Sequence, residues 1–413
     1  MIGLYLSDLY THCKAISLKD PSSSGKIKTW FQEKIIQIST ELQIAGDENL
    51  IKHLQSPAFR EALCSGQSDP YLSIFYLVNS LGEYSASASE LDELGRYRYL
   101  CSVQKGTGIT RNLVLEYILE TVKKDAFLNR HFESRPHRSY FFLSHDIDAL
   151  YGSVWQDGFW ALKHFRLDVM LKILANAAMS KAHWFNMDLI AELESEYGFR
   201  STFYWLVNKG RINKRERNSD YTIQSPGLKS CINNLSEKGF EHGLHKSISA
   251  EGFKSERRKM PLEVQGNRYH YLRFNLPDAY KTIEESGLKL DASLGFAEHY
   301  GFRNNYGYPF SPYDFSTGKA FNFLELPLNI MDGTFQRYLK LPVQETAQTI
   351  IHFFEEQREN AVLSILWHNT FFTNYKYKGY REEYRKILAF LYEEKFTNIN
   401  QSDLIRQFAW KQN

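Results

Sequence analysis

The sequence predicts an α/β fold, with a parallel sheet or barrel in the larger C-terminal part of the chain and a mainly helical segment before it. From Tyr140 onward, short apolar strand-like runs alternate with helical stretches, which is typical of a parallel α/β sheet. Before that point, apolar residues recur mostly at helical spacing. We therefore divide the chain into a mainly helical accessory domain at residues 1–135 and an α/β domain at 136–413.

The N-terminal segment is interpreted as helices joined by short polar loops. Helical apolar spacing runs from Trp30 to Leu42 and again from Asn112 to Val122. Clusters of Pro, Ser and Gly at 21–25 and 65–70 mark loops. The apolar run Tyr71–Val78 fits either a strand or a helix. We expect this segment to pack against one side of the following domain.

The α/β domain begins with the run Ser139–Leu143, which predicts a buried strand. In chain order, the later pattern predicts three pairs of a helix followed by a strand: 187–197 with 201–207, 276–286 with 288–291, and 344–360 with 362–367. In folds of this kind, functional residues collect at the C-terminal ends of the strands. The polar residues that follow these runs are therefore the first candidates for a site.

Two carboxylates follow the first of these strands, in the stretch Ser144-His145-Asp146-Ile147-Asp148. Side chains alternate along a strand, so Asp146 and Asp148 are expected on one side and His145 on the other. Two like charges side by side are tolerable when a cation or a shared proton lies between them. A solvated Asp-x-Asp in a turn, or a helix N-cap, is the alternative interpretation.

Three histidine-bearing stretches follow or stand beside strand-like runs further along the chain. They are Gly239–Ser247 with its Gly-Leu-His, Gly266–Phe274 with its Arg-x-His, and Ala361–Asn369 with its Leu-Trp-His. A carboxylate and two imidazoles from separate strands, with positions left open for water, form a catalytic metal site. Any one of these histidines alone is more often structural, so the prediction depends on their similar placement.

At these residues the chain resembles the polysaccharide deacetylase family, the NodB-homology group of carbohydrate esterase family 4-like proteins. It is most similar to a divergent bacterial branch that carries His-Asp-x-Asp in place of Thr-Phe-Asp-Asp. The resemblance covers roughly residues 136–375, and its motifs occur in family order: Asp146-x-Asp148, 198–204, Gly243-Leu244-His245, Arg268-x-His270, 291–296 with 301–303, and Leu366-Trp367-His368. It implies a distorted, incomplete (β/α) barrel of the polysaccharide deacetylase type.

The resemblance also implies a role for individual residues. Asp148 and His245 match metal ligands, and Asp146 matches the catalytic base. The usual family pattern has a second histidine four residues after the first, but here that position is Ser249. In the similar branch the histidine of Arg-x-His takes its place, which nominates His270 as the third ligand.

His242 is the weaker alternative for that ligand position, because on a strand it would face away from His245. Two further roles are implied by the resemblance. Arg268 matches the arginine that pairs with the catalytic aspartate, and His368 matches the general acid that protonates the departing amine.

These roles predict a metal-dependent amide hydrolase that removes an N-acetyl group from a sugar, with a divalent metal, most simply Zn²⁺, as cofactor. The expected substrate is an N-acetylated glycan precursor or a polysaccharide intermediate of surface-glycan assembly. Two alternatives stay open. In the first, the protein hydrolyses a formamide or a cyclic amide, as relatives with the same fold do. In the second, it is a catalytically silent glycan-binding protein that keeps the barrel without turnover.

Composition limits the partners and the location. Fifty basic and 48 acidic residues give a net charge of +2, which argues against a nucleic-acid binder. No apolar run reaches the roughly 18 residues of a membrane span, and the N-terminus lacks the pattern of a secretory signal. The four cysteines, at 13, 64, 101 and 231, have no pair spacing and are expected as free thiols. We therefore expect a cytoplasmic enzyme, which favours a nucleotide- or lipid-linked sugar; the oligomeric state is not indicated.

One segment, Tyr151–Trp184, exceeds what a minimal catalytic domain needs. It is rich in Trp and Phe, and Leu167–Met179 has helical periodicity. Three interpretations fit: a lid over the cleft, a surface for a lipid-linked substrate, or an extra packed pair of helices.

Overall fold

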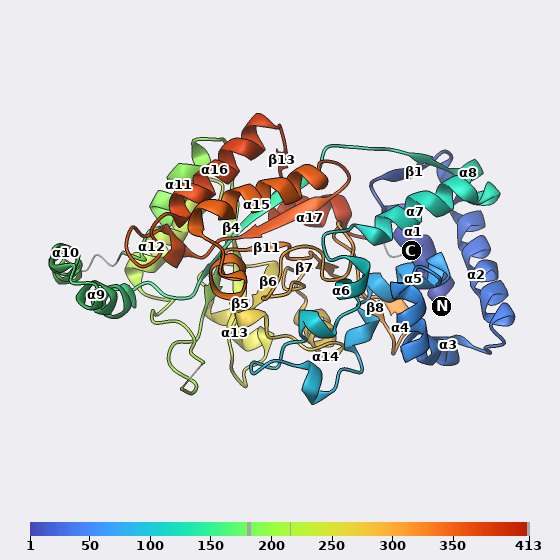
Figure 1. The fold of residues 1–413 in the computed structure, drawn as a ribbon, viewed down its shortest axis with the longest axis horizontal. Helices are drawn as coiled ribbons and strands as arrows, with labels where there is room; N and C mark the ends of the chain where they lie inside the picture. The colour runs from blue at the N-terminus through green and yellow to red at the C-terminus, as the bar shows by residue number, and fades with distance from the viewer. Residues whose placement is uncertain (180–182, 215, 411–413) are drawn as a thin grey trace.

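A parallel sheet forms the centre of the C-terminal part of the protein in the computed structural model (Figure 1), which describes residues 1–179, 183–214 and 216–410. Neighbouring strands follow the order β10-β7-β6-β5-β4-β3-β12-β11, and β13 pairs with the start of β3. Their bounds are β3 Tyr140–Ile147, β4 Ser201–Leu206, β5 Glu241–Lys246, β6 Gly266–Tyr269, β7 Leu290–Asp291, β10 Leu324–Glu325, β11 Ile330–Met331, β12 Val362–Leu366 and β13 Thr397–Asn398. All these pairings are parallel, so the carboxyl ends of the strands meet at one edge.

The two outer strands of the sheet belong to one continuous segment, residues 324–331. Its first part, β10, pairs with β7 at one end of the sheet, and its last part, β11, pairs with β12 at the other end. Between them, the backbone N–H groups of Leu326 and Leu328 donate to Asp291 and Leu294. The segment thus joins both edges of a curled sheet. The predicted α/β class and incomplete barrel are confirmed in this form.

Buried strands and amphipathic helices explain why the sequence folds in this way. Strands β3 and β12 are buried along almost their whole length, because helices cover the sheet from outside. The helices alternate with the strands, and α15, α16 and α11 lie together along one side of the sheet (Figure 1). Their bounds are α11 Met187–Ser195, α12 Pro226–Glu237, α13 Phe253–Lys259, α14 Asp278–Ser286, α15 Val343–Glu356, α16 Tyr380–Glu393 and α17 Gln401–Phe408. The three predicted helix–strand pairs are confirmed, with ends that differ by a few residues.

The N-terminal segment is mainly helical, as predicted, and it lies at one end of the molecule (Figure 1). The ambiguous run Tyr71–Val78 is helical, within α5. Asp69 caps this helix by accepting hydrogen bonds from the first backbone N–H groups, and Pro70 occupies its first position. The elements are α1 Ile2–His12, β1 Ile16–Leu18, α2 Ser24–Glu41, α3 Asp47–Leu54, α4 Pro57–Cys64, α5 Pro70–Val78, α6 Gln104–Thr107, α7 Leu113–Lys124, α8 Ala126–His131 and β2 Phe132–Ser134.

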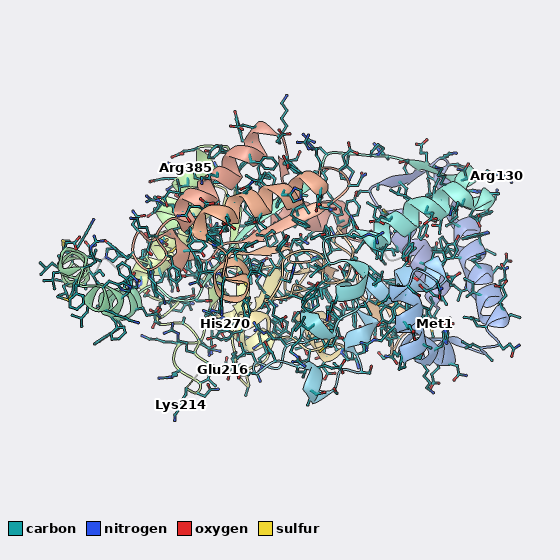
Figure 2. All side chains as sticks on the ribbon, in the orientation of Figure 1. Met1, Arg130, Lys214, Glu216, His270 and Arg385 are labelled. Atoms are coloured by element: carbon teal, nitrogen blue, oxygen red, sulfur yellow. The ribbon has the colours of Figure 1, made fainter. Side chains whose placement is uncertain are left out.

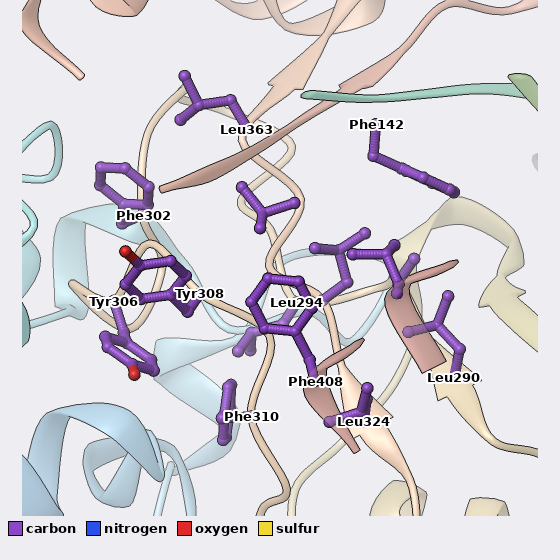
Figure 3. Packing of buried hydrophobic residues seen from close by; sticks show 14 of the residues in the cluster. Phe142, Leu290, Leu294, Phe302, Tyr306, Tyr308, Phe310, Leu324, Leu363 and Phe408 are labelled. Carbon is purple, nitrogen blue, oxygen red and sulfur yellow. The ribbon is translucent and has the colours of Figure 1, made fainter. Parts of the chain in front are cut away.

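The helical segment and the barrel share one apolar core. Leu6 and Phe75 of the helical segment lie in the same cluster of buried side chains as Phe310 and the strand residue Leu363 of the barrel. Figure 3 shows part of the barrel's share of this cluster. The Tyr5 hydroxyl donates to the Ser311 carbonyl at 3.0 Å, and the buried Arg303 pairs with Glu83 at 2.5 Å. These contacts fix the segment against the barrel, as expected of a packing partner. The division near residue 135 stays a prediction.

The extra segment between β3 and β4 forms two antiparallel helices, α9 (Ser153–Lys163) and α10 (Leu167–Ala178). They project from the body at the end opposite the N-terminal helices (Figure 1). Residues 180–182 of the predicted 151–184 segment lie outside the described residues. Among the described residues, no helix is both long and apolar enough to cross a bilayer.

Candidate metal centre

Asp146 near the end of β3 and Asp148 just after it lie on one side, and His145 lies on the other, as the alternation of side chains predicts. Asp146 and Asp148 both approach His245 on β5, with oxygens 3.6 and 3.3 Å from its Nε2. His145 lies on the other side, where its Nδ1 donates to the Trp367 carbonyl and its Nε2 lies 2.8 Å from Glu194. The Asp-x-Asp stretch is therefore the end of a buried strand, not a solvated turn.

Asp148, His245 and His270 converge from the ends of β3, β5 and β6, with β4 between β3 and β5 in the sheet. His245 Nε2 lies 3.0 Å from His270 Nδ1, and Asp148 Oδ1 lies 3.3 Å from the former and 3.4 Å from the latter. His270 reaches this point because β6 passes directly into a tight turn at His270–Leu272, in which Tyr271 has a φ of 59°. The histidines are buried, whereas the Asp148 side chain is 34% exposed. One side of the group is thus open to solvent.

Hydrogen bonds fix which nitrogen of each imidazole faces the group. His245 Nδ1 lies 2.9 Å from the Arg268 carbonyl, and His270 Nε2 lies 2.9 Å from the Arg217 carbonyl. A carbonyl only accepts, so these two nitrogens carry the protons, and in neutral rings the two facing nitrogens carry lone pairs. Two lone pairs and a carboxylate oxygen therefore meet, with no donor among the three atoms. Such an orientation of histidines through their second nitrogen is typical of metal ligands.

These three atoms fit a small divalent cation. Ligand bonds of about 2.0–2.2 Å around a tetrahedral Zn²⁺ separate neighbouring ligand atoms by about 3.3–3.6 Å. The observed separations are 3.0, 3.3 and 3.4 Å. Asp148 Oδ1 is a buried atom without a hydrogen-bond partner among the described residues, and a cation would supply the missing interaction. Asp148, His245 and His270 can therefore hold a metal ion.

The electrostatics of the group favour one added positive charge. Burial lowers the pKa of His270 to about 4, and repulsion by His245 adds to this effect. Burial acts in the same direction on His245, but the attraction of Asp146 and Asp148 outweighs it, so the pKa of His245 is raised. Burial opposes the charge on Asp148, yet the surrounding histidines hold its pKa well below the usual range. The two aspartates thus favour positive charge at His245, and the histidines favour the charged form of Asp148.

His368, at the end of β12, faces the same group from the other side. Its Nε2 lies 3.9 Å from Asp148 Oδ2, while its Nδ1–H donates to Asp332 at 2.7 Å. Burial opposes protonation, but the attraction of Asp332 and Asp148 outweighs it and raises the pKa of His368 to about 9. At neutral pH the ring therefore carries a proton on the nitrogen that points toward the group.

Asp332 is a further residue of the site that the sequence patterns do not predict. This buried residue follows β11 and also accepts the backbone N–H of His368 at 2.6 Å, so it fixes both the ring and the backbone of that residue. The sequence pattern that could have indicated it is an aspartate directly after the apolar pair Ile330-Met331. That pair forms β11, which is too short to be recognised as a strand from the sequence.

Arg268 is buried and pairs with Asp146. Its Nη1–H group donates to Asp146 Oδ1 and to the Ser144 hydroxyl, both at 2.9 Å, and its Nε–H donates to the Ala292 carbonyl. The guanidinium also lies over the ring of Tyr204. Held in this way, Asp146 keeps its second oxygen directed toward His245 and the three converging atoms.

His242 faces away from the group, as expected for a residue three positions from His245 on one strand. The Trp205 indole N–H donates to its Nδ1 at 3.0 Å, and its Nε2–H donates to the Ser236 hydroxyl at 3.1 Å. Ser249, in the position of the missing family histidine, donates to Glu256 instead. The structure therefore brings His270, and not His242 or Ser249, to Asp148 and His245.

A cavity of about 520 Å³ opens over these residues. Asp146, Asp148, His245, His270 and His368 line it, and so do six cationic side chains: Arg96, Arg211, Lys214, Arg217, Arg337 and Lys376. Figure 2 shows His270 within the body and Lys214, with Glu216, on the loop below it. The cavity is large enough for one or two sugar rings and is lined for an anionic group.

No protein-family model matches the chain, and no curated protein does. Several solved structures match it. A putative polysaccharide deacetylase from Mycobacterium smegmatis is 13% identical with a TM-score of 0.42, over 67% of this chain and 92% of that one. A 4-alpha-glucanotransferase from Thermococcus litoralis is 14% identical with a TM-score of 0.41, over 66% and 41%. A putative polysaccharide deacetylase involved in O-antigen biosynthesis from Bordetella bronchiseptica is 16% identical with a TM-score of 0.33, over 66% and 86%. Polysaccharide deacetylases are thus among the structures that the chain is similar to, as its motifs predict.

Proposed function

We propose that the protein is a metal-dependent hydrolase that removes the N-acetyl group of a sugar. One observation carries the proposal: Asp148, His245 and His270 present three acceptor atoms to one point, and Asp146 and His368 flank it. A pure glycan-binding protein has no need of a carboxylate and an imidazole at opposed positions beside such a group. We propose Zn²⁺ as the ion, because two imidazoles and one carboxylate are ligands that it favours in catalytic sites.

The residues of the chain then have defined tasks in amide hydrolysis. A bound divalent cation would lower the pKa of a water molecule and polarise the substrate carbonyl. Asp146 takes a proton from the attacking water while the oxygen of that water bonds to the carbonyl carbon. Arg268 keeps the Asp146 carboxylate in position. His368 gives its Nε2 proton to the nitrogen as the C–N bond breaks, which releases acetate and the free amine. Each proton transfer contributes about 10²–10⁴ in rate.

The walls of the cavity support a substrate that carries negative charge. Six cationic side chains line the cavity, and Arg96 among them is paired with Asp92. Outside the candidate centre, the described lining includes one acidic residue, Glu216. A nucleotide- or lipid-linked N-acetyl sugar carries phosphate next to the sugar, which such an excess of positive charge attracts. We propose a precursor of this kind, used in surface-glycan assembly. The four cysteines form no disulfide within the described residues, in keeping with a cytoplasmic location.

Acetate release tests the proposal. Purified protein loaded with Zn²⁺ is expected to release acetate from nucleotide-linked N-acetylhexosamines. The Asp146→Asn variant should keep its metal and lose turnover by about 10²–10⁴. The matched control is Asp278→Asn, an acidic residue in the first turn of α14, which should keep both. Hydrolysis of N-formyl or cyclic-imide substrates, without release of acetate from N-acetyl sugars, would mean that the same centre serves the alternative hydrolase activity. If no amide is hydrolysed, the proposal that the protein is an enzyme is contradicted.

A further inference from the structure

The hairpin of α9 and α10 carries most of the large apolar side chains that the protein exposes. Nine of the fifteen exposed large hydrophobic residues within the described part of the chain lie between Tyr151 and Met179. Among them, the side chains of Trp155 and Phe165 are 82% and 91% exposed. Scattered single residues of this kind need no explanation, but nine of them gathered on one projecting element mark an interaction surface.

The two helices have separate inner and outer apolar stripes. Ala161, Val169 and Ile173 form a small buried cluster of their own, which holds the hairpin together. The exposed residues follow helical spacing on other faces: Trp155, Phe159 and Leu162 on α9, and Leu167, Leu171 and Leu174 on α10. The outer stripes are therefore not needed for packing the hairpin.

The tip of the hairpin holds a phenylalanine where helices favour glycine. The N–H of Arg166 donates to the Ala161 carbonyl, which ends α9 in the common C-terminal turn. Phe165 takes the left-handed position of this turn, with a φ of 54°. A bulky residue is strained there, and glycine is not. The sequence thus keeps an exposed aromatic ring at the tip against a conformational cost.

Cationic side chains accompany this apolar surface. Lys163, Arg166 and Lys172 are exposed, whereas Asp157 is buried and Asp168 pairs with Arg166 at 2.7 Å. Exposed Trp, Phe and Leu beside Lys and Arg are typical of elements that lie in the interface of an anionic bilayer. The helices are 11 and 12 residues long, well short of the roughly 20 that a span requires.

We propose that the hairpin docks the protein on the surface of an anionic phospholipid membrane, with the ring of Phe165 and the outer stripes in the interfacial layer. This inference stands on the hairpin and does not depend on the proposed reaction. It has a consequence for the cavity, because Gln156 of α9 lines the cavity wall and bonds Lys376 at 3.3 Å. A docked hairpin brings the mouth of the cavity close to the head groups, where a lipid-linked sugar would lie.

Sedimentation with vesicles tests the docking without any activity readout. The full chain is expected to sediment with vesicles of equal parts phosphatidylglycerol and phosphatidylcholine, and far less with phosphatidylcholine alone. The triple variant Trp155→Ser, Phe159→Ser, Phe165→Ser should lower the partition coefficient by about tenfold or more. A matched triple variant, Ile36→Ser, Leu42→Ser, Leu100→Ser, removes exposed apolar residues elsewhere and should change it little.

A second variant separates binding from folding. Phe165→Gly relieves the strained turn, so it should leave thermal stability unchanged or slightly raised and still weaken binding severalfold. Equal sedimentation of all variants, or none of the wild-type chain, would overturn the proposal. A third outcome would also overturn it: light scattering shows a wild-type dimer, the Phe165→Gly variant is a monomer, and neither binds vesicles. The exposed surface would then join two copies of this chain.

Discussion

Four buried histidines of the barrel form two pairs with different surroundings: His145 with His242, and His245 with His270. In His145 and His242, both ring nitrogens have partners: a carbonyl and a carboxylate for the first, an indole N–H and a hydroxyl for the second. In His245 and His270, one nitrogen of each ring donates to a backbone carbonyl, and the other faces its counterpart and Asp148. The nitrogens of the first pair all have partners within the protein's own hydrogen-bond network, whereas the second pair brings two imidazole nitrogens and Asp148 together at a point that can take a cation.

Burial does not distinguish a structural histidine from a candidate ligand in this protein. All four rings are buried, and His242 and His245 even share one strand. What differs is the atom that the second nitrogen faces. His242 Nδ1 accepts the indole N–H of Trp205 and His145 Nε2 faces Glu194, whereas His245 Nε2 and His270 Nδ1 face each other as well as Asp148, an arrangement that can hold a metal ion.

Metal affinity should separate the two pairs most strongly. His270→Ala and Asp148→Ala remove a ligand atom, so each should weaken Zn²⁺ binding by about 100-fold or more. His242→Ala removes only a core contact and should leave the affinity within a few-fold of wild type. Calorimetric titration of the metal-free proteins measures both. Loss of binding in His242→Ala with retention in His270→Ala would reverse the assignment.

Turnover should depend on the histidine that flanks the group without joining it. His368→Gln is expected to keep the metal and lower kcat by about 10²–10⁴, because the leaving nitrogen is no longer protonated. Asp332→Asn should have a smaller effect of the same kind, since it only loosens the orientation of the ring. Steady-state kinetics with metal analysis of the same samples checks both variants. A His368→Gln enzyme with full kcat would remove this residue from the reaction.

The free energy of unfolding should depend more on the first pair of histidines than on the second. His145→Ala leaves the buried Glu194 without its imidazole partner, which should cost about 3–5 kcal/mol in the free energy of unfolding. His270→Ala in the metal-free protein removes one of the two imidazole lone pairs that face each other. Its cost in the free energy of unfolding should therefore be much smaller. Urea unfolding of the metal-free variants gives both values. A larger loss in His270→Ala than in His145→Ala would mean that the second pair, too, is structural.

Two carboxylates extend the comparison to pH. The histidines around Asp148 lower its pKa, whereas burial of Asp157 in α9 raises the pKa of that residue to about 6, against a smaller opposing effect of Lys376. The folded state then holds the Asp157 proton more tightly than the unfolded state does. Stability of the hairpin should fall as the pH rises from about 4 to about 6 and stay lower above that, by up to about 3 kcal/mol. Hydrogen exchange of α9 amides at pH 5 and pH 8 measures this, and Asp157→Asn should abolish the difference.

Much of the site follows from the period of strands. Alternation predicts that Asp146 and Asp148 share one side of β3 and that His242 turns away from His245, and both expectations are confirmed. Parallel order predicts that strand ends meet at one edge. These features depend only on local geometry, which the sequence pattern records.

The rest depends on contacts that no local pattern records. The position of His270 requires a left-handed Tyr271 and the carbonyl of Arg217 from a distant loop, and the proton on His368 requires Asp332 at the end of a two-residue strand. The run Tyr71–Val78 was ambiguous because all its residues are buried, so neither period is visible; its cap, Asp69-Pro70, holds the missing signal.

The most direct test of the central claim is a crystal structure of the Zn²⁺-loaded protein with anomalous data at the zinc edge. The account predicts one strong peak about 2.0–2.2 Å from His245 Nε2, His270 Nδ1 and an oxygen of Asp148. A peak held by other residues, or none at this point in fully loaded protein, would contradict it.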